Sequence, residues 1–140
     1  MKKKTIKLLL LFTVYCSVAF PTFSQDTRVL GIWVTEDNLG KIEIYKQGNK
    51  FFGKIIWAKD PEKLDLNNPN EKLRNRKVVG VEILKDFVFS EKNTWNNGTV
   101  YDPKNGKTYS CIMKLRNEKE LEIRGYIGFS WIGRSSIWSR

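Results

Sequence analysis

Polar and apolar residues alternate through the chain from about residue 29 onward. In residues 41–45, for example, Ile42 and Ile44 share one face and polar residues fall on the other, a pattern typical of a half-buried β-strand. Runs of this kind recur at short intervals with turn residues between them, which favours an antiparallel sandwich or barrel. We therefore predict about eight strands in up-and-down order. They cover residues 29–35, 41–45, 51–57, 78–84 with a continuation at 87–90, 94–101, 108–115, 121–125 and 130–140.

Several turns between these strands have recognisable chemistry. Gln-Gly-Asn at residues 47–49 is typical of a tight hairpin, because glycine tolerates a positive φ. Asp102, Pro103 and Gly106 predict another turn, since proline presets φ and the Asn-Gly step accommodates positive φ. Asn-Gly at residues 97–98 interrupts the fifth predicted strand and indicates a kink or bulge there.

A polar connection at residues 58–77 breaks the alternation. Connections of this length inside a compact domain usually carry function or act as lids. We expect a short helical turn at residues 61–64. Asp65, Asn68 and Pro69 superficially suggest a calcium-binding loop, but the run lacks the glycine and the glutamate that an EF-hand requires. An Asx-turn ended by proline is the simpler interpretation.

Aromatic and basic residues mark both ends of the alternating region. Gly31 and Trp33 belong to the first predicted strand. Trp138 and Arg140 belong to the last. The first and last strands of a closed barrel must meet to remove the sheet edges, so we expect these residues to close the barrel. Trp33 is expected to stack against either Arg134 or Arg140.

The first 24 residues have the pattern of a cleaved signal peptide. Lysines precede an apolar stretch at residues 8–20, and small or polar residues around position 24 offer a cleavage point. The stretch is too short for a stable bilayer-spanning helix, which needs ~20 apolar residues. A lipoprotein signal ending at Cys16 is the weaker alternative, because Tyr15 is bulky where a small residue is wanted. We predict an exported protein, periplasmic or secreted, with one domain at residues 25–140 and no transmembrane segment in the mature chain.

Removal of the signal lowers the positive charge. The whole chain has 25 Lys and Arg against 15 Asp and Glu, a net charge of +10. Four lysines and no acidic residue leave with the signal, so the mature chain carries +6. A solvated basic surface explains this charge, and so does attraction to an anionic envelope component or an acidic ligand. Nucleic acid is a poor partner for an exported protein.

The residue types available restrict the chemistry. The chain contains no histidine, which excludes Ser-His-Asp and Cys-His catalysis and removes the commonest metal ligand. Cys111 is the single cysteine of the mature chain, so we expect no disulfide and no zinc site, and its apolar neighbours favour a buried thiol over a reactive one. We predict no cofactor, no metal and no enzymatic activity. The alternative is a carboxylate-based hydrolase, with candidates Asp60, Asp65, Asp102 and Glu122.

A series of short motifs carries a family resemblance. The motifs are Gly31-Ile32-Trp33, Gly53-Lys54-Ile55-Ile56-Trp57, Asp65 with Asn68-Pro69, Gly80, residues 98–103, residues 106–109, residues 124–128 and Trp138-Ser139-Arg140. Together they resemble the exported bacterial family known as domain of unknown function 2147, over residues 31–140. That family has no assigned activity, so the resemblance implies location and domain size rather than chemistry. The Gly-x-Trp start and the late arginine are also similar to the lipocalin and fatty-acid-binding pattern, which implies a lipocalin- or calycin-like barrel.

These observations predict an all-β fold, a single small antiparallel barrel. We expect this barrel to bind a small apolar or amphipathic ligand without catalysis. Eight strands leave room for one small ligand, and five tryptophans supply apolar lining. A second hypothesis is an envelope protein–protein or surface-interaction module with a filled core, which the six basic residues between Lys59 and Lys77 support. A cavity of ~300 Å³ or more lined by aromatic residues favours the first hypothesis. The candidate ligand contacts are Phe51, Trp57, Tyr109, Arg124, Tyr126 and Arg134.

Overall fold

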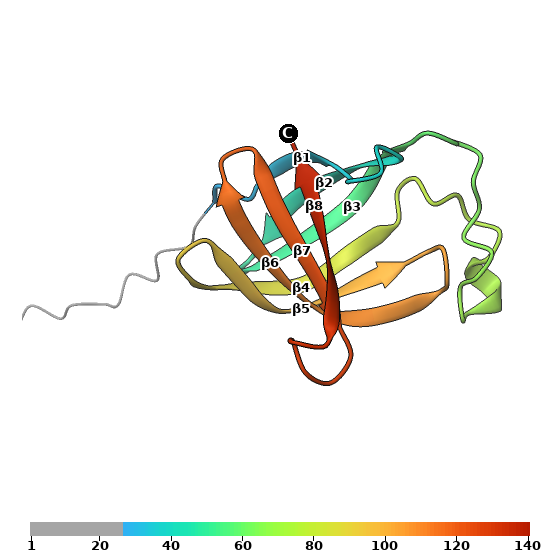
Figure 1. Ribbon diagram of the computed structural model, residues 1–140. Coiled ribbons are helices and arrows are strands. Elements are labelled where there is room, and N and C mark those ends of the chain that lie inside the picture. Colours follow the sequence, from blue (N-terminus) through green and yellow to red (C-terminus); the bar gives the residue numbers. More distant parts are fainter. Residues whose placement is uncertain (1–26) are drawn as a thin grey trace, which may run out of the picture.

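Eight antiparallel strands close into a barrel in the computed structural model, which describes residues 27–140 (Figure 1). Each strand pairs with the next one along the chain, and β8 returns to β1. The predicted all-β class, the antiparallel barrel of about eight strands and the up-and-down order are confirmed. The predicted signal peptide lies outside the described residues. The strands are β1 (Gly31–Val34), β2 (Gly40–Gln47), β3 (Lys50–Ala58), β4 (Glu82–Glu91), β5 (Thr94–Asp102), β6 (Lys107–Asn117), β7 (Glu120–Tyr126) and β8 (Gly133–Ser139).

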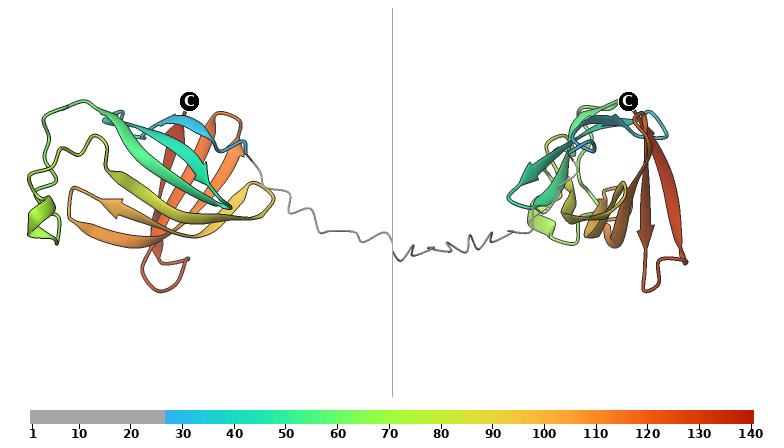
Figure 2. Two further views of the ribbon diagram at one scale, coloured as in Figure 1. Left: turned by 180° about the vertical axis from the view of Figure 1, so that it is seen from behind. Right: turned by 90° about the vertical axis from the view of Figure 1, so that its left-hand side faces the viewer.

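The seam between β1 and β8 is very short. Val34 and Ser139 are the only residues aligned across it in the described part of the chain, whereas β2 and β3 align eight pairs. Strands that meet over so little length need side chains to complete the closure. Figure 2 shows the barrel from two further sides, with the β7–β8 hairpin projecting beyond its neighbours.

Large apolar side chains fill one end of the barrel. Phe51 and Trp95 are fully buried there, and edge-on contacts join the Trp95 ring to Phe51 and Phe89 at centroid distances of 6.0 and 5.5 Å. Gly98 on β5 leaves room for this packing, because a Cβ at that position would lie 2.4 Å from the ring of Phe87. Interiors are packed close to the density of organic crystals, so these side chains fill the inside of the barrel at this end.

The strand β5 bends where its Asn-Gly step predicted a kink. Asn97 has a φ of 62°, and the pairing of β5 with β6 shifts register between Trp95 and Gly98. An asparagine adopts this left-handed conformation more readily than most residues. The bend brings the Gly98 backbone against the aromatic core.

A second bulge, on β3, corrects one prediction. Ile42 pairs with Ile55 and Lys41 pairs with Trp57, so Ile56 is an extra residue with no partner on β2. A bulge of this kind reverses the faces of the residues that follow it. Trp57 is therefore 43 % exposed, beneath the Lys41 ammonium at 5.5 Å, and Ala58 is buried instead. The prediction that Trp57 shares the inner face with Ile55 is wrong.

The connection between β3 and β4 occupies residues 59–81. Its helical turn lies at Glu71–Leu73, not at residues 61–64 as predicted. Asn70 begins this turn by accepting a 3.1 Å hydrogen bond from the N–H of Lys72. The strand predicted to begin at residue 78 begins at Glu82, because residues 78–81 form a turn in which the N–H of Val81 donates to the Val78 carbonyl at 3.1 Å.

The last strand also begins later than predicted, at Gly133 instead of residue 130. Two backbone hydrogen bonds turn the chain before it. The N–H of Phe129 donates to the Ile127 carbonyl at 3.1 Å, and the N–H of Ile132 donates to the Phe129 carbonyl at 3.0 Å. Residues 127–132 therefore form a separate loop between β7 and β8, which we call the apolar loop.

Candidate functional site

The end of the barrel opposite the aromatic core is hollow. A cavity of about 1350 Å³ opens there to solvent. Four connections surround its mouth: the β1–β2 turn, the β3–β4 connection, the β5–β6 turn and the apolar loop. Cavities that bind small molecules usually measure ~300–1,000 Å³, so the space accommodates one ligand of ordinary size and some water.

The inner wall of this cavity is apolar. Strand alternation directs one aliphatic residue after another inward from several strands, and Ile42 and Ile55 face each other as direct partners on β2 and β3. The only buried polar side chains in residues 27–140 are Asp65 and Asn68, and neither lines the cavity. A ligand group that packs on this inner wall therefore meets no charged side chain. The wall residues are Ile42, Ile55, Ala58, Val78, Ile83, Val100, Ile123 and Trp138.

Tyrosines and charged residues line the outer part of the cavity. Tyr101, Tyr109 and Tyr126 are among these residues, and the Tyr109 hydroxyl accepts a 2.9 Å hydrogen bond from Asn105. Four acidic and four basic side chains surround the mouth, so its formal charges cancel. They are Glu36, Asp37, Asp60, Asp102, Lys59, Lys63, Lys104 and Arg134.

One ion pair spans this mouth. The Lys104 ammonium lies 3.0 Å from Oδ2 of Asp37 and so joins the β5–β6 turn to the β1–β2 turn. Partial burial alone raises the pKa of Asp37, but hydrogen bonds from Thr35 and from the Leu39 N–H, together with Lys104, lower it to about 2. The carboxylate therefore stays ionised at physiological pH and keeps the two turns together.

A buried carboxylate fastens the β3–β4 connection to the barrel. Asp65 has no exposed surface and accepts hydrogen bonds from Tyr101 at 2.6 Å, from Asn68 at 2.8 Å and from Arg76 at 3.0 Å. The Arg76 guanidinium also pairs with it at 2.9 Å. We call these four residues the Asp65 cluster. Burying a charge is costly unless it is paired and hydrogen-bonded, and here both carboxylate oxygens are satisfied.

The same connection is also pressed against the β5–β6 turn. Asn67 donates a 2.8 Å hydrogen bond from its amide to the Lys104 carbonyl. Gly106 has a φ of +72°, and a Cβ there would lie 1.7 Å from the Asn67 carbonyl oxygen. The glycine therefore serves both the turn geometry and the close backbone approach. The predicted loop residues Asp65, Asn68 and Gly106 thus fix the β3–β4 connection against β5 and the β5–β6 turn, outside the cavity lining.

Residues 31–140, the whole barrel, match the family described as "Uncharacterized protein conserved in bacteria (DUF2147)". The chain belongs to this family.

A solved structure shares the fold of this DUF2147 chain. It is protein HP1028 from the human pathogen Helicobacter pylori, which is described as belonging to the lipocalin family. The two chains are 30 % identical, with a TM-score of 0.72, and the match covers 79 % of this chain and 81 % of that one. The expected family resemblance and the lipocalin-like barrel are thereby confirmed. No curated protein matches the chain.

The DUF2147 barrel brings three of the six candidate ligand contacts together. Tyr109, Tyr126 and Arg134 all line the outer cavity. Phe51 lies in the filled end, where it packs against Trp95, and does not reach the cavity.

Trp57 and Arg124 point away from the cavity for two different reasons. The β3 bulge turns Trp57 outward. Arg124 alternates with the buried Ile123 and lies on the outer face, where its Nε donates to the Ser130 carbonyl at 2.7 Å. Strict alternation on β7 could have identified this orientation from the sequence. The emphasis on aromatic residues also missed the aliphatic wall, although Ile42, Ile55 and Ile123 all occupy inward positions of their strands.

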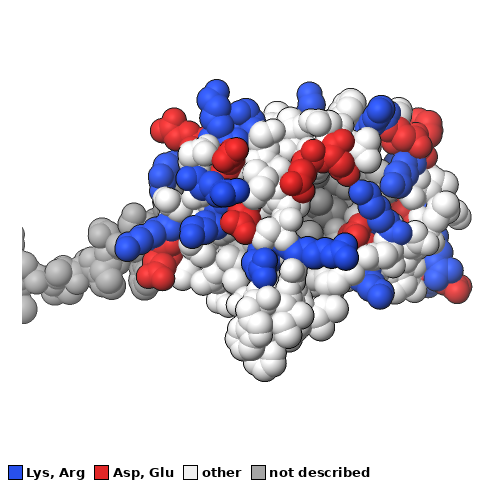
Figure 3. All heavy atoms as spheres, viewed as in Figure 1, with Lys and Arg blue, Asp and Glu red and all other residues white. Residues whose placement is uncertain are grey.

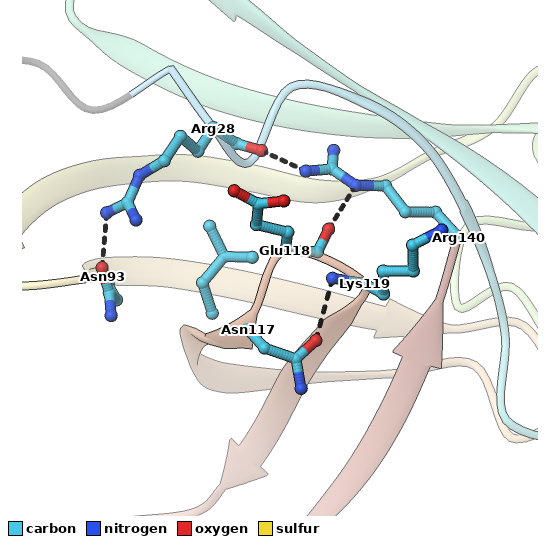
Figure 4. A pocket seen from close by; sticks show the side chains of 7 residues that line it. Arg28, Asn93, Asn117, Glu118, Lys119 and Arg140 are labelled. Atoms are coloured by element: carbon cyan, nitrogen blue, oxygen red, sulfur yellow. Dashed lines mark hydrogen bonds between the residues drawn. The ribbon is translucent and has the colours of Figure 1, made fainter.

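The filled end carries the predicted closure contacts. The Arg140 guanidinium lies over the Trp33 ring, 4.2 Å from its centroid. A shallow polar pocket of about 590 Å³ lies beside it (Figure 4). There the Arg140 side chain donates to three backbone carbonyls, those of Arg28, Leu30 and Glu118, at 2.9, 3.0 and 2.8 Å. Through these bonds Arg140 joins the end of the chain to the segment before β1 and to the β6–β7 turn.

The four carboxylates considered for a hydrolase all make structural contacts. Asp60 and Asp102 each accept a hydrogen bond from a backbone N–H two residues later, at 3.1 and 2.9 Å, as in ordinary Asx-turns. Glu122 lies outside the barrel and accepts a 2.6 Å hydrogen bond from Ser135. The Arg76 guanidinium pairs with Asp65, the residue that suggested a calcium loop, at 2.9 Å. These contacts belong to turns and ion pairs, which favours a binding protein over a carboxylate-based hydrolase.

Cys111 is buried and chemically quiet. Burial raises the pKa of its thiol to about 12, so the thiolate needed for reactivity is scarce. Residues 27–140 contain no group of three or more Cys, Asp or Glu side chains arranged to hold a metal ion. In the same part of the chain, no helix has the length and apolar character needed to span a bilayer.

Proposed function

We propose that this DUF2147 protein binds a small apolar or amphipathic molecule in the open half of its barrel. The observation that carries the proposal is the combination of an apolar wall around a cavity of about 1350 Å³ with a polar, charge-balanced mouth. Removing apolar surface from water drives such binding, at roughly 25 cal/mol per Å². The lipocalin description of the relative HP1028 is consistent with the same role.

The distribution of polar groups suggests how the ligand lies. Its apolar part contacts the aliphatic wall, where no charged side chain is available. Any polar group lies at the mouth, within reach of the hydroxyls of Tyr109 and Tyr126 and of the Arg134 guanidinium. Because acidic and basic groups balance there, a neutral or zwitterionic head group suits the mouth as well as an anionic one.

The filled-core alternative fits only half of the molecule. The aromatic packing around Trp95 fills one end, but the opposite end is hollow. A surface module has no need for an apolar hollow of this size. The basic residues of the β3–β4 connection, which motivated that alternative, are partly engaged: Arg76 pairs with Asp65 and Lys77 pairs with Glu62, each at 2.9 Å.

The place of action is part of the proposal. The signal-peptide pattern of residues 1–24 supports export, so the ligand is met outside the cytoplasm. Native mass spectrometry of protein recovered from the cell envelope without detergent measures two things at once. The protein mass gives the cleavage point, expected near residue 25, and an added mass lost on denaturation reveals a carried ligand. Bare protein that also fails to take up an added probe would contradict the proposal.

The probe experiment uses N-phenyl-1-naphthylamine, an uncharged apolar fluorophore, and two variants of β3. Ala58 faces the cavity, so Ala58→Trp fills it and is expected to weaken probe binding at least about tenfold, or ~1.4 kcal/mol. Ile56 is the bulged residue and does not line the cavity, so Ile56→Trp adds the same ring outside and is expected to leave binding unchanged. Equal binding by both variants, with both folded, would place the probe elsewhere.

A further inference from the structure

The apolar loop exposes an unusual concentration of large apolar side chains. Ile127, Phe129, Trp131 and Ile132 are 71, 59, 72 and 61 % exposed. They are four of the eight large exposed apolar residues in the described chain, and all lie within six consecutive positions. Scattered exposed apolar residues are normal, but a contiguous patch marks a surface that meets an apolar partner.

The conformation of the loop is fixed from within the hairpin. Arg124 on β7 holds its centre by donating to the Ser130 carbonyl at 2.7 Å, in addition to the two backbone turns that the loop contains. The rings of Phe129 and Trp131 stack at 4.4 Å between centroids, with 14° between their planes. The loop therefore presents the rings of Phe129 and Trp131 together, outside the cavity.

The loop also borders the cavity. Ile127 and Ile132 belong to the cavity lining, whereas Phe129 and Trp131 lie beyond it. Figure 3 shows the loop as an uncharged lobe below a surface covered with charged side chains. A continuous apolar path thus leads from the tip of the lobe to the mouth of the barrel.

The charged residues at the base of the loop indicate which kind of surface the loop contacts. From residue 123 to residue 136 the chain contains two arginines, Arg124 and Arg134, and no carboxylate. The two occupy opposite faces of the hairpin, because Arg134 pairs with Gly125 in register and faces the cavity. The nearest carboxylate on β7, that of Glu122, accepts a hydrogen bond from Ser135. The loop carries aromatic and aliphatic side chains at its tip and guanidinium groups at its base. An anionic lipid surface offers the matching order, with acyl chains inside and negatively charged phosphates outside.

We propose that the apolar loop inserts into the surface of an anionic phospholipid bilayer. Phe129 and Trp131 enter the boundary between head groups and acyl chains, where tryptophan is favoured. The guanidinium groups of Arg124 and Arg134 then lie at the level of the lipid phosphates. In this orientation the loop side of the cavity mouth adjoins the membrane, so an apolar ligand can pass between bilayer and cavity along Ile127 and Ile132. The membrane contact itself does not depend on the proposed ligand binding.

Flotation with lipid vesicles tests the insertion. Protein purified without detergent from the cell envelope is expected to float with vesicles of phosphatidylethanolamine and phosphatidylglycerol. The double variant Phe129→Ser/Trp131→Ser is expected to lose at least about tenfold in partitioning, because two interfacial aromatic anchors are removed. The matched control is Ile32→Ser/Leu66→Ser, which removes two exposed apolar side chains that lie outside both the loop and the cavity lining. It is expected to float like the unmodified protein.

Three further measurements distinguish insertion of the loop from self-association and from loss of ligand binding. Arg134→Gln is expected to weaken flotation about fivefold at low salt, with a smaller effect in pure phosphatidylcholine vesicles. Brominated lipids are expected to quench tryptophan fluorescence of the Ile32→Ser/Leu66→Ser control but not of Trp131→Phe. The Phe129→Ser/Trp131→Ser and Trp131→Phe variants are expected to keep their affinity for N-phenyl-1-naphthylamine in solution, so a failure of ligand binding is distinguishable.

Three results would overturn the proposal. The unmodified protein does not float, or the double variant floats equally well, or the unmodified protein is a dimer that the double substitution dissociates.

Discussion

The hydroxyl of Tyr101 donates a 2.6 Å hydrogen bond to Oδ1 of Asp65, a carboxylate with no exposed surface. Tyr101 is a residue of β5 and also lines the cavity, whereas Asp65 belongs to the long β3–β4 connection. One contact therefore joins the barrel wall, the connection and the candidate site. The connection is held as a fixed part of the mouth, and its position depends on a single buried charge with several donors.

Replacing Asp65 by asparagine tests this dependence. Asp65→Asn leaves Arg76 without its partner inside the cluster, and we expect the free energy of unfolding in urea to fall by about 3 kcal/mol. Asp86→Asn is the matched control, because Asp86 pairs with Lys50 at 3.4 Å with both side chains about half exposed. Asp86→Asn is expected to lower the free energy of unfolding by less than about 0.5 kcal/mol. Equal losses in the two variants would show that the Asp65 cluster contributes nothing beyond a surface ion pair.

The same carboxylate predicts a pH dependence. Burial alone raises the pKa of Asp65, but hydrogen bonds from Tyr101, Asn68 and Arg76, with the Arg76 charge, outweigh it and hold the pKa below 3.8. A carboxyl group whose pKa is lower in the folded state stabilises the fold fully above its unfolded pKa. That contribution is lost as the pH falls from 3.8 through the lower folded value.

The measurement is the difference in unfolding free energy between the native sequence and Asp65→Asn as a function of pH. We expect a constant difference from about pH 7 to pH 5 and a decrease below about pH 4. A difference that grew on acidification would contradict the assigned direction of the pKa shift.

Local alternation in the sequence was sufficient for the barrel but not for all of its interior. Alternation at Ile42, Ile44 and Ile123 is a local property, so the strands and their order followed from it. The bulge at Ile56 depends on how β3 pairs with β2, and no local signal marks it. Alternation alone therefore places Trp57 on the wrong face.

The candidate site shows the same division between local and long-range information. Turn chemistry identified Asp65, Asn68 and Gly106 as loop residues, but their joint role needs contacts with Tyr101 and Arg76 that only the fold creates. The helical turn lies about ten residues later than predicted, because it begins at the capping asparagine at position 70 and not at the proline at position 61. Capping of this kind is a local signal that sequence reasoning could have used.

The packing of Phe87 against Gly98 leaves no room for a side chain at position 98. A Cβ at this position would lie 2.4 Å from the Phe87 ring, so Gly98→Ala is expected to lower the unfolding free energy by about 2–3 kcal/mol. Gly40→Ala is the matched control, because a Cβ there meets its nearest neighbour at 3.6 Å. The second change Phe87→Leu is expected to restore part of the loss in Gly98→Ala but to destabilise the native sequence. If Gly98→Ala were as stable as Gly40→Ala in urea unfolding, the Phe87 ring would have room to move away from β5.

Arg140 closes the barrel through its shape as well as its charge. Its guanidinium lies over Trp33 and donates to the carbonyls of Arg28, Leu30 and Glu118, a set that a single ammonium cannot reproduce. Arg140→Lys is therefore expected to lower the unfolding free energy by about 2 kcal/mol and to change the near-ultraviolet circular dichroism that reports on Trp33. Arg134→Lys at the exposed mouth preserves charge in the same way and is expected to change stability by less than about 0.5 kcal/mol. Indistinguishable unfolding curves for the two lysine variants would mean that positive charge alone closes the seam. If only Arg140→Lys lowers the unfolding free energy, the closure depends on the planar guanidinium of Arg140. That group then compensates for the short pairing between β1 and β8.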